Sequence, residues 1–388
     1  MKIWITAARL FTPSDSIENP LLAVEDGKVA VLSSRAEVEL PPGAKHLDFP
    51  DSVIAPGYID IHVHGGAGHD VMQDDPSGQA DFEKALARHG VTAYLPTTVT
   101  ASLDRILGAL DRLGNAISAE ESGHSHIGAR PLGIHLEGPF ISAAKCGVHP
   151  TRYLVSPTPA LFEKMWDASG GTLKMMTVAP ELPGASETIR LARERGVLTS
   201  IGHSNATYAE AKAGIAAGAV SATHTFNAMR ALDHREPGIL GAVLTNEQLS
   251  ADIIIDGIHV DPAVVSLFLK AKGQEKAILI SDAISATGMP DGKYKLGPFE
   301  VTVKGDRAEL EGKLAGSVLT MDRAVRNVMK FANWKLQQAI VLATRNPARL
   351  MGFETKGTIA VGRDADLVFL TPEGDVRQTM VGGRMAVS

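Results

Sequence analysis

After residue 53 the chain alternates short apolar runs with helix-like stretches, and this alternation restricts its fold more than any other feature. The eight apolar runs are Ile54–Val63, Val91–Val99, Leu132–Leu136, Leu173–Val178, Val197–Ile201, Val220–Thr225, Ala251–Ile255 and Ala277–Ile280. Such runs, separated by helices, are typical of βα units with a parallel sheet. Eight of them fit a (β/α)8 TIM-like barrel better than an open doubly wound sheet.

Most gaps between the runs contain a predicted helix. These helices are Pro76–His89, Leu103–Ile117, Pro159–Ala168, Ser186–Arg195, Tyr208–Ala217 and Pro262–Ala271, with a shorter one at Leu240–Thr245. After the last run, the pattern predicts two more helices, Asp322–Phe331 and Gln337–Met351.

Both ends of the chain have sequence patterns that are typical of β-strands. Predicted strands are Lys2–Ala7, Leu21–Glu25, Lys28–Leu32, residues 357–370 and Thr379–Val387. We therefore expect residues 1–55 and 355–388 to form one small β-sandwich beside a barrel that spans residues 56–354. A hairpin insertion near residues 291–316, with strands at Tyr294–Val303 and Ala308–Leu314, is expected within the barrel.

The composition argues against several classes of function. A net charge of −6 provides no basic surface for nucleic acid or an anionic membrane. The chain has no 18-residue apolar span, and the apolar run between Lys2 and Arg9 is too short for a secretory signal, so we expect a cytoplasmic protein. Cys146 is the only cysteine, which excludes an intrachain disulfide and a thiolate-based structural zinc site. Any metal must be held by nitrogen and oxygen atoms.

Polar residues gather where the predicted strands end, and barrel active sites lie at that end. They are His62, His64, Glu137, His203, His224, His259 and Asp282. Alternate residues of a strand share a face, so His62 and His64 project to the same side. We expect Glu137, His203 and His224 to hold a metal with room for water, and Asp282 to act as general base and then general acid.

Each of these residues also has an ordinary structural interpretation. The two strand-one histidines could form an exposed strand edge, Glu137 could cap a loop, and Asp282 could cap a turn. His203 could simply precede a helix N-cap and His224 could be a satisfied core histidine, whereas His135 is more consistent with a packed neighbour of the site than with a ligand. The position of His259 favours a substrate contact over a structural role.

Ordered motifs extend along almost the whole chain. They are PGYID (56–60), HLEGP (135–139), GVHP (147–150), GHSNAT (202–207), THTFNAM (223–229), REPG (235–238), DGIH (256–259), SD (281–282) and LAGS (314–317). In these motifs the chain resembles the amidohydrolase superfamily and, within it, the family of N-acetylglucosamine-6-phosphate deacetylases. That resemblance implies hydrolysis of N-acetyl-D-glucosamine 6-phosphate to D-glucosamine 6-phosphate and acetate, in amino-sugar catabolism or cell-wall recycling.

The resemblance implies one or two divalent metal ions. Glu137, His203 and His224 would hold the first ion. Relatives that carry His-x-His on the first strand hold a second ion. His62 and His64 therefore favour a second ion bridged by Glu137. A carboxylated lysine, which bridges metals elsewhere in the superfamily, has no clear counterpart, because Lys174 lies near the beginning of its strand. Zinc, iron, manganese and cobalt all suit these ligands.

The resemblance also assigns the remaining roles. His149 would stabilise the oxyanion, a contribution of about 3 kcal/mol for such donors. Arg235, reaching in from the neighbouring subunit of a homodimer, would bind the phosphate with His259 and the backbone of Asn227 and Ala228. Further substrate contacts would come from Val148, Leu314, Ala315 and Gly316. An ion pair of Arg235 with Glu236 or Asp233 is the alternative for that arginine.

Other interpretations stay open at the level of sequence. The galactosamine isomer, a cyclic amide or an amine could be the substrate, and a non-catalytic scaffold is a remote alternative. Cys146 lies between Glu137 and His149, so its thiolate could reach the metal and lower activity, or it could be an inert residue on a lid.

Overall fold

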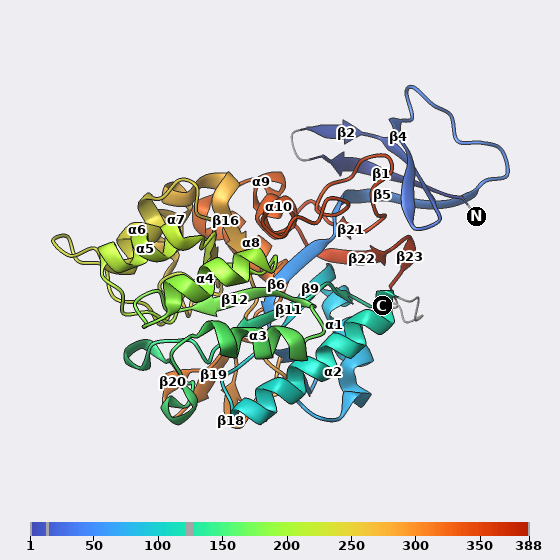
Figure 1. The fold of residues 1–388 in the computed structure, drawn as a ribbon. Helices are drawn as coiled ribbons and strands as arrows, with labels where there is room; N and C mark the ends of the chain where they lie inside the picture. Colours follow the sequence, from blue (N-terminus) through green and yellow to red (C-terminus); the bar gives the residue numbers. More distant parts are fainter. Residues whose placement is uncertain (1, 13–14, 122–127, 387–388) are drawn as a thin grey trace.

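A closed parallel barrel forms the larger part of the computed structural model, which describes residues 2–12, 15–121 and 128–386 (Figure 1). Its strands are β6 (Tyr58–Val63), β9 (Val91–Thr98), β11 (Ile134–Glu137), β12 (Leu173–Val178), β13 (Leu198–Ile201), β14 (Ser221–Ala222), β15 (Ala251–Ile253) and β16 (Ala277–Leu279). The strands from β6 to β14 pair in parallel within one sheet, which also contains the short β10 (Arg130–Pro131), and β15 pairs with β16.

Backbone hydrogen bonds close the barrel between these two groups of strands. The amide of Thr225 donates to the carbonyl of Asp252 at 2.9 Å, which joins the end of β14 to β15. The amide of Asp282 donates to the carbonyl of His62 at 3.0 Å, which joins the segment after β16 to β6. The predicted barrel fold is confirmed.

Helices cover the outside of the barrel (Figure 1). They are α1 (Gln79–Arg88), α2 (Leu103–Glu121), α3 (Pro159–Ala168), α4 (Ala185–Glu194), α5 (Tyr208–Ala217), α6 (Gly238–Thr245), α7 (Pro262–Lys276), α8 (Met321–Ala332), α9 (Leu336–Ile340) and α10 (Arg345–Met351). The prediction of a single helix over residues 337–351 was wrong. This segment divides into α9, a 3₁₀ turn and α10. Pro347 explains the division, because proline has no backbone N–H and clashes with the preceding turn.

Two predicted strands also needed correction. The run Ile54–Val63 divides at Gly57, so that its first residues belong to the terminal sheet and only β6 belongs to the barrel. The run Val220–Thr225 contains only the two-residue β14, because the backbone turns out of the sheet with a φ of 29° at His224 and 81° at Phe226.

Both ends of the chain contribute to a separate sheet domain (Figure 1). In the described residues it is an eight-stranded sheet in the order β23-β22-β21-β5-β1-β3-β4, with β2 paired to β1. The strands are β1 (Ile3–Phe11), β2 (Ser16–Glu18), β3 (Pro20–Glu25), β4 (Lys28–Ser34), β5 (Lys45–Pro56), β21 (Leu367–Leu370), β22 (Val376–Val381) and β23 (Arg384–Met385). The predicted strand end at Val387 and the predicted domain ends at residues 1 and 388 lie outside the described residues.

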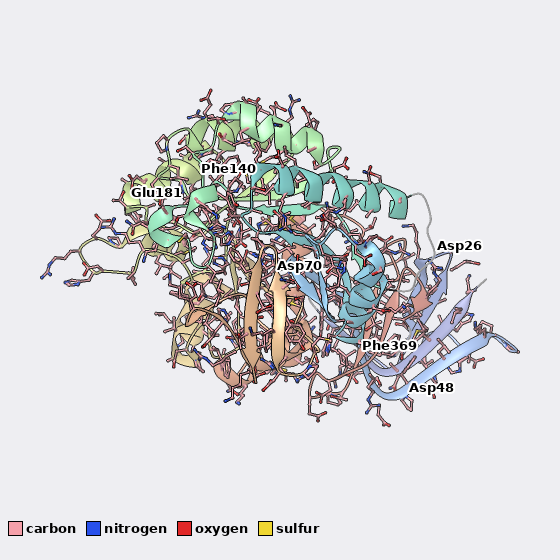
Figure 2. All side chains as sticks on the ribbon, turned by 90° about the horizontal axis from the view of Figure 1, so that it is seen from below. Asp26, Asp48, Asp70, Phe140, Glu181 and Phe369 are labelled. Atoms are coloured by element: carbon pink, nitrogen blue, oxygen red, sulfur yellow. The ribbon has the colours of Figure 1, made fainter. Side chains whose placement is uncertain are left out.

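The terminal sheet has its own apolar core, which includes Ile5, Leu22, Ile54 and Phe369. The rings of Phe49 and Phe369 stack with centroids 4.2 Å apart. Phe369 lies in this domain, whereas Phe140 and Glu181 lie in the barrel, well away from the terminal sheet (Figure 2). The site described below is therefore built by the barrel and its loops.

The predicted insertion is a four-stranded antiparallel sheet within the described chain, not a single hairpin. Its strands are β17 (Gly292–Leu296), β18 (Phe299–Lys304), β19 (Arg307–Leu310) and β20 (Lys313–Leu314). The prediction of one long strand at 294–303 failed because the chain turns at Gly297, which has a φ of 54° and precedes a proline. A further two-stranded hairpin, β7 (Gly65–Gly66) with β8 (His69–Asp70), follows β6.

None of the helices in the described part of the chain combines the length and the apolar composition that a bilayer crossing requires.

Candidate active site

Glu137, the last residue of β11, lies at the centre of a cluster of histidines at the C-terminal end of the barrel. Its Oε1 is 3.2 Å from Nε2 of His203 and 3.0 Å from Nε2 of His224. Its Oε2 is 3.4 Å from Nε2 of His64. Glu137, His203 and His224 therefore converge as predicted, although the three come from different strands of the barrel.

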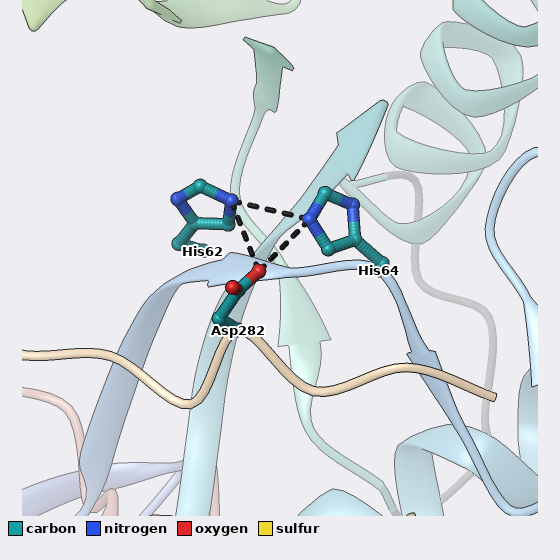
Figure 3. Close-up of side chains that lie close together, drawn as sticks. All are labelled: His62, His64 and Asp282. Carbon is teal, nitrogen blue, oxygen red and sulfur yellow. Dashed lines mark hydrogen bonds and ion pairs between the residues drawn. The ribbon is translucent and has the colours of Figure 1, made fainter. Parts of the chain in front are cut away.

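A second group, His62, His64 and Asp282, has side chains that point toward one another (Figure 3). Nε2 of His62 and Nε2 of His64 are 3.2 Å apart, and Oδ1 of Asp282 lies 3.4 Å from the first nitrogen and 3.0 Å from the second. Nε2 of His62 is also 3.5 Å from Oε1 of Glu137. The ligand atoms of this group lie close enough together to hold one ion.

The orientation of the histidine rings fits metal binding. Nδ1 of His64 is 2.8 Å from the carbonyl of Thr97, and Nδ1 of His203 is 2.9 Å from the carbonyl of Lys145. A carbonyl only accepts, so in both rings Nδ1 carries a hydrogen, and Nε2 is the nitrogen that would bind an ion. Hydrogen bonds of this kind fix ligating histidines in metal sites.

The charges of the cluster also fit a divalent ion. Burial alone would raise the pKa of Glu137, but the surrounding imidazoles, led by His62, hold it well below its usual range. Burial opposes ionisation of Asp282 as well, yet contacts with His64 and His62 bring its pKa to about 2. Burial lowers the pKa of His203 to about 4, which favours the neutral imidazole that a metal requires. The carboxylates have the opposite effect on two other rings: Glu137 raises the pKa of His224 to about 9, and Asp282 and Glu137 raise the pKa of His64, both against the effect of burial. A bound ion would therefore displace protons from these two imidazoles. Carboxylate and imidazole ligands together suit zinc, iron, manganese or cobalt.

Three residues of the cluster have a left-handed backbone, which is uncommon outside glycine. The φ angles are 46° at His203, 29° at His224 and 51° at Asp282. Each lies just after the end of a barrel strand, where the chain bends to aim the side chain into the mouth. Such backbone strain is found preferentially at functional sites.

An open pocket with a cavity volume of about 130 Å³ lies over the cluster. Of the residues predicted from sequence, it is lined by His64, Glu137, Val148, His149, His203, His224, Asn227, Ala228, His259, Asp282, Leu314 and Gly316. Ala315 is fully buried and is not part of this lining. Val99, Ile254 and Leu296 add apolar walls that the sequence prediction did not include.

His149 lies beside the cluster but differs from the ligand-like histidines. Its Nε2 is 3.6 Å from Oε2 of Glu137, so by position alone it belongs to a possible ligand group with Glu137 and His203. Its Nδ1, however, accepts from the amide of Thr100 at 3.2 Å. The ring therefore presents an N–H to the pocket, as expected for the predicted oxyanion donor.

His259 faces the pocket from the loop after β15. Its Nδ1 is 2.6 Å from Oδ2 of Asp256, and Oδ1 of the same carboxylate accepts the amides of Ile258 and His259 at 2.8 Å. The pKa of Asp256 is lowered because its hydrogen bond and ion pair with His259 outweigh burial. The loop thus holds the imidazole by Nδ1, and Nε2 has no hydrogen bond to any residue in the described part of the chain.

Arg235 is not in this pocket. It lies on the loop between β14 and α6, where residues 231–236 are all exposed and Leu232 is 51% exposed. This yellow-green loop projects away from the barrel (Figure 1). The amide of Arg235 donates to Oδ1 of Asp233 at 2.8 Å, whereas no ion pair of its guanidinium occurs among the described residues.

The remaining predicted residues lie at the edge of the site. His135 is buried, with its ring centroid 4.7 Å from that of His62, and its Nδ1 donates to the carbonyl of Ile61 at 3.0 Å. Both its nitrogens have protein partners, since Nε2 is 2.8 Å from Oγ1 of Thr177. Cys146 is half-buried, its Sγ lies 3.8 Å from the carbonyl of Gly147, and it is not part of the pocket lining.

Sequence reasoning missed several residues that support the site. Asp60 accepts the amide of His62 at 3.2 Å and the hydroxyl of Ser281, and burial raises its pKa to about 7. Asp252 accepts the amide of His224 through Oδ1. Thr97 and Thr100 lie at and just beyond the end of β9, and the strand-end rule that identified the ligands would also have selected them.

Comparisons with known proteins agree with this geometry. The sequence model of the amidohydrolase family matches residues 53–386. The chain is 38% identical to an N-acetylglucosamine-6-phosphate deacetylase of Bacillus subtilis (strain 168), over 97% of this chain and 95% of that protein. It is 36% identical to an N-acetylgalactosamine-6-phosphate deacetylase of Escherichia coli O157:H7, over 98% of each. A solved mutant N-acetyl-D-glucosamine-6-phosphate deacetylase from Mycobacterium smegmatis, in complex with N-acetyl-D-glucosamine-6-phosphate, superposes with a TM-score of 0.90 at 33% identity and covers 100% of both chains.

Proposed function

The chain belongs to the amidohydrolase family, and on that premise we propose that it removes the acetyl group from N-acetyl-D-glucosamine 6-phosphate. It is a hydrolase whose relatives act on N-acetylated amino-sugar 6-phosphates. The products are D-glucosamine 6-phosphate and acetate, as required when an amide is cleaved by water. The single observation that carries the proposal is the convergence of Glu137, His203, His224 and Asp282 at one pocket that also contains an N–H donor and a second histidine, His259.

We propose that Glu137, His203 and His224 hold one divalent ion, and that His62, His64 and Asp282 hold a second with Glu137 between them. Glu137 contacts histidines of both sets, since its Oε1 is 3.0 Å from Nε2 of His224 and 3.5 Å from Nε2 of His62, and this supports a place for its carboxylate in both ligand sets. When bound, a divalent ion would lower the pKa of water from 15.7 to about 7 and so supply hydroxide at neutral pH.

Asp282 is the proposed proton carrier. Its carboxylate lines the pocket and is ionised at neutral pH, because its pKa is about 2. It therefore accepts a proton from the attacking water and then delivers that proton to the sugar nitrogen as the C–N bond breaks. The amine leaves with the proton, and the acetyl group leaves as acetate.

His149 is the proposed partner of the developing oxyanion. Its Nε2 hydrogen points into the pocket next to Glu137, where the carbonyl oxygen of the acetyl group gains negative charge. Pre-oriented donors of this type act without reorganisation in the transition state, and one of them is worth about 3 kcal/mol.

We further propose that the phosphate is bound by His259, the backbone of Asn227 and Ala228, and Arg235 of a second subunit. The first three line the pocket of the same chain. The exposed, projecting loop that carries Arg235 supports contribution to a neighbouring copy, since its guanidinium lies on the surface of its own chain. Val148, Leu314 and Gly316 would enclose the sugar. A homodimer follows from this proposal and stays a prediction, as does the cytoplasmic location expected from the sequence.

Acetate release tests the function directly. Protein reconstituted with a divalent metal is assayed with N-acetylglucosamine 6-phosphate, with the galactosamine isomer and with unphosphorylated N-acetylglucosamine. We expect the fastest turnover with the first substrate. Equal or faster turnover of the galactosamine isomer would favour the second candidate, which the similarity to the Escherichia coli relative supports. No acetate from any of the three, with metal bound, would overturn the proposal.

A further inference from the structure

The hydrogen bonds of His149 differ in kind from those of the neighbouring histidines. Thr100 follows β9, is fully buried and approaches Nδ1 of His149 with two groups. Its backbone amide donates to that nitrogen at 3.2 Å, and its hydroxyl oxygen lies 2.8 Å from it. His64 and His203 instead direct Nδ1 at carbonyl oxygens.

This difference determines where each ring carries its hydrogen. An amide always carries a hydrogen, so Nδ1 of His149 must offer its lone pair to Thr100. The hydroxyl of Thr100 can add a second donor to the same nitrogen. The neutral ring of His149 is then protonated at Nε2, which is the nitrogen that faces Glu137 and the pocket. An Nε2 that carries hydrogen cannot coordinate an ion.

The packing around Thr100 keeps these groups together. Gly138 directly follows Glu137 and has a φ of 77°. A Cβ at this position would lie 2.0 Å from Oγ1 of Thr100 and 3.4 Å from Nδ1 of His149. The hydroxyl and the imidazole therefore fit against the backbone next to the central carboxylate, and only glycine leaves room for them.

We propose that Thr100 is a positioning residue that holds His149 as its Nε2–H tautomer and so makes it an oxyanion donor instead of a metal ligand. The inference rests on the proposed deacetylase function for its kinetic consequence, but the tautomer itself is independent of the substrate. His149 thus differs from two of its neighbours: His64 and His203 have a carbonyl at Nδ1, which leaves Nε2 for an ion, whereas the amide and hydroxyl at Nδ1 of His149 leave a hydrogen on Nε2 for the substrate.

Three variants of the metal-loaded enzyme test the proposal by acetate release. Thr100→Val removes the hydroxyl at nearly constant volume, and Thr100→Ser retains it. Loss of one hydrogen bond that positions the donor should lower kcat roughly three- to tenfold and change KM by less than about twofold. Thr100→Ser should have nearly the original kcat, and metal content should be the same in all variants.

Thr98→Val is the matched control. Thr98, the last residue of β9, is equally buried, and its hydroxyl has no hydrogen-bond partner within the described residues. Its replacement should leave kcat unchanged. An equal loss of kcat in Thr98→Val and Thr100→Val would show a general packing effect and overturn the positioning role.

The tautomer is measured by ¹⁵N NMR of histidine-labelled enzyme, with His149→Gln to assign the signals. The expected spectrum has the proton of His149 on Nε2, and a shift of the Nδ1 signal in Thr100→Val. A protonated Nδ1, or an Nε2 coordinated to metal, would overturn the inference. If the original enzyme releases no acetate from any substrate, the proposed function fails, and the spectrum alone decides this inference.

Discussion

Nε2 of His64 and Oδ1 of Asp282 lie 3.0 Å apart, and this contact joins the first and the last strand of the barrel across its catalytic mouth. The backbone reinforces the connection, because the amide of His64 donates to the carbonyl of Ala283 at 2.8 Å. The proposed proton carrier and a proposed metal ligand are therefore connected by both a side-chain contact and a backbone hydrogen bond.

Asp282→Asn should remove catalysis while leaving the fold intact. An amide cannot accept the proton of the attacking water, and general acid–base groups contribute typically about 10²–10⁴-fold to the rate. We expect kcat for acetate release to fall by at least about a hundredfold. Binding of the substrate, measured by calorimetry, should change little. Retention of more than a tenth of kcat would contradict the role of Asp282.

The number of bound ions is tested by replacing His62 and His64, which lie at the end of β6, the first strand of the barrel. In the double variant His62→Asn, His64→Asn, we expect the metal content per chain to fall by about one ion, because only the set around Glu137 stays complete. His203→Asn should instead weaken the first ion. Elemental analysis after dialysis gives the stoichiometry, and an unchanged value in the double variant would show that the pair is not a metal site.

The convergence of the proposed ligands could be predicted from the sequence because of a geometric rule. Residues at the C-terminal ends of parallel strands meet at one mouth whatever their separation along the chain, so Glu137, His203, His224 and Asp282 could be grouped without coordinates. Strand alternation likewise placed His62 and His64 on one face. These deductions need only the order of the strands.

The supporting contacts could not be predicted in the same way. The carbonyl of Lys145 fixes the tautomer of His203, but every residue has a carbonyl and its position depends on the loop fold. Thr100 gains its role only because the loop that carries His149 folds back onto β9. Likewise, β14 is short because the backbone turns at His224, a left-handed conformation that residue type does not specify.

Arg235→Lys tests the phosphate contact. A guanidinium binds a phosphate through two parallel hydrogen bonds, which a lysine cannot reproduce. We expect KM for the phosphorylated substrate to rise roughly tenfold or more, since an ionic hydrogen bond is worth about 1.5–3 kcal/mol. Turnover of the unphosphorylated sugar should be unaffected. Equal effects on both substrates would assign the loop a structural role.

The contact between subunits has a test of its own. If Arg235 completes the pocket of a neighbouring copy, a mixture of inactive Asp282→Asn and weakened Arg235→Lys chains should contain pockets in which neither change occurs. Such mixtures should recover activity above the sum of the two separate preparations. Strictly additive activity after subunit exchange would contradict the shared site.

The inserted sheet is anchored to the barrel by Asp70. Its Oδ2 accepts the amide of Gly297 at 2.7 Å, next to Leu296, which lines the pocket. Asp70→Ala should loosen this wall and raise KM several-fold, with a smaller effect on kcat, because a hydrogen bond to a charged group is worth about 1.5–3 kcal/mol. Asp291→Ala is the control, since Asp291 accepts the amide of Gly305 at 2.8 Å at the exposed end of the same sheet. Equal rises in KM would argue against a specific role of Asp70.

Asp322 should make the stability of the fold depend on acid pH. Burial alone would raise the pKa of its carboxyl, but His89, Thr320 and Arg326 outweigh burial and hold the pKa at about 2, below its ordinary value of 3.8. A carboxyl with a lowered pKa stabilises the folded state above its ordinary value, and this contribution disappears as the pH falls from about 4 to 2. The difference between the two pKa values corresponds to about 2 kcal/mol.

Asp322→Asn isolates this contribution from the other carboxylates. At pH 7 the variant should unfold more easily in urea than the original protein, by about 2 kcal/mol. Between pH 4 and 2 the two proteins should converge, because the original carboxyl becomes protonated and loses its ion pairs with His89 and Arg326. Parallel curves over this range would show that Asp322 titrates alike in the folded and unfolded chains, and that its two ion pairs add no net stability.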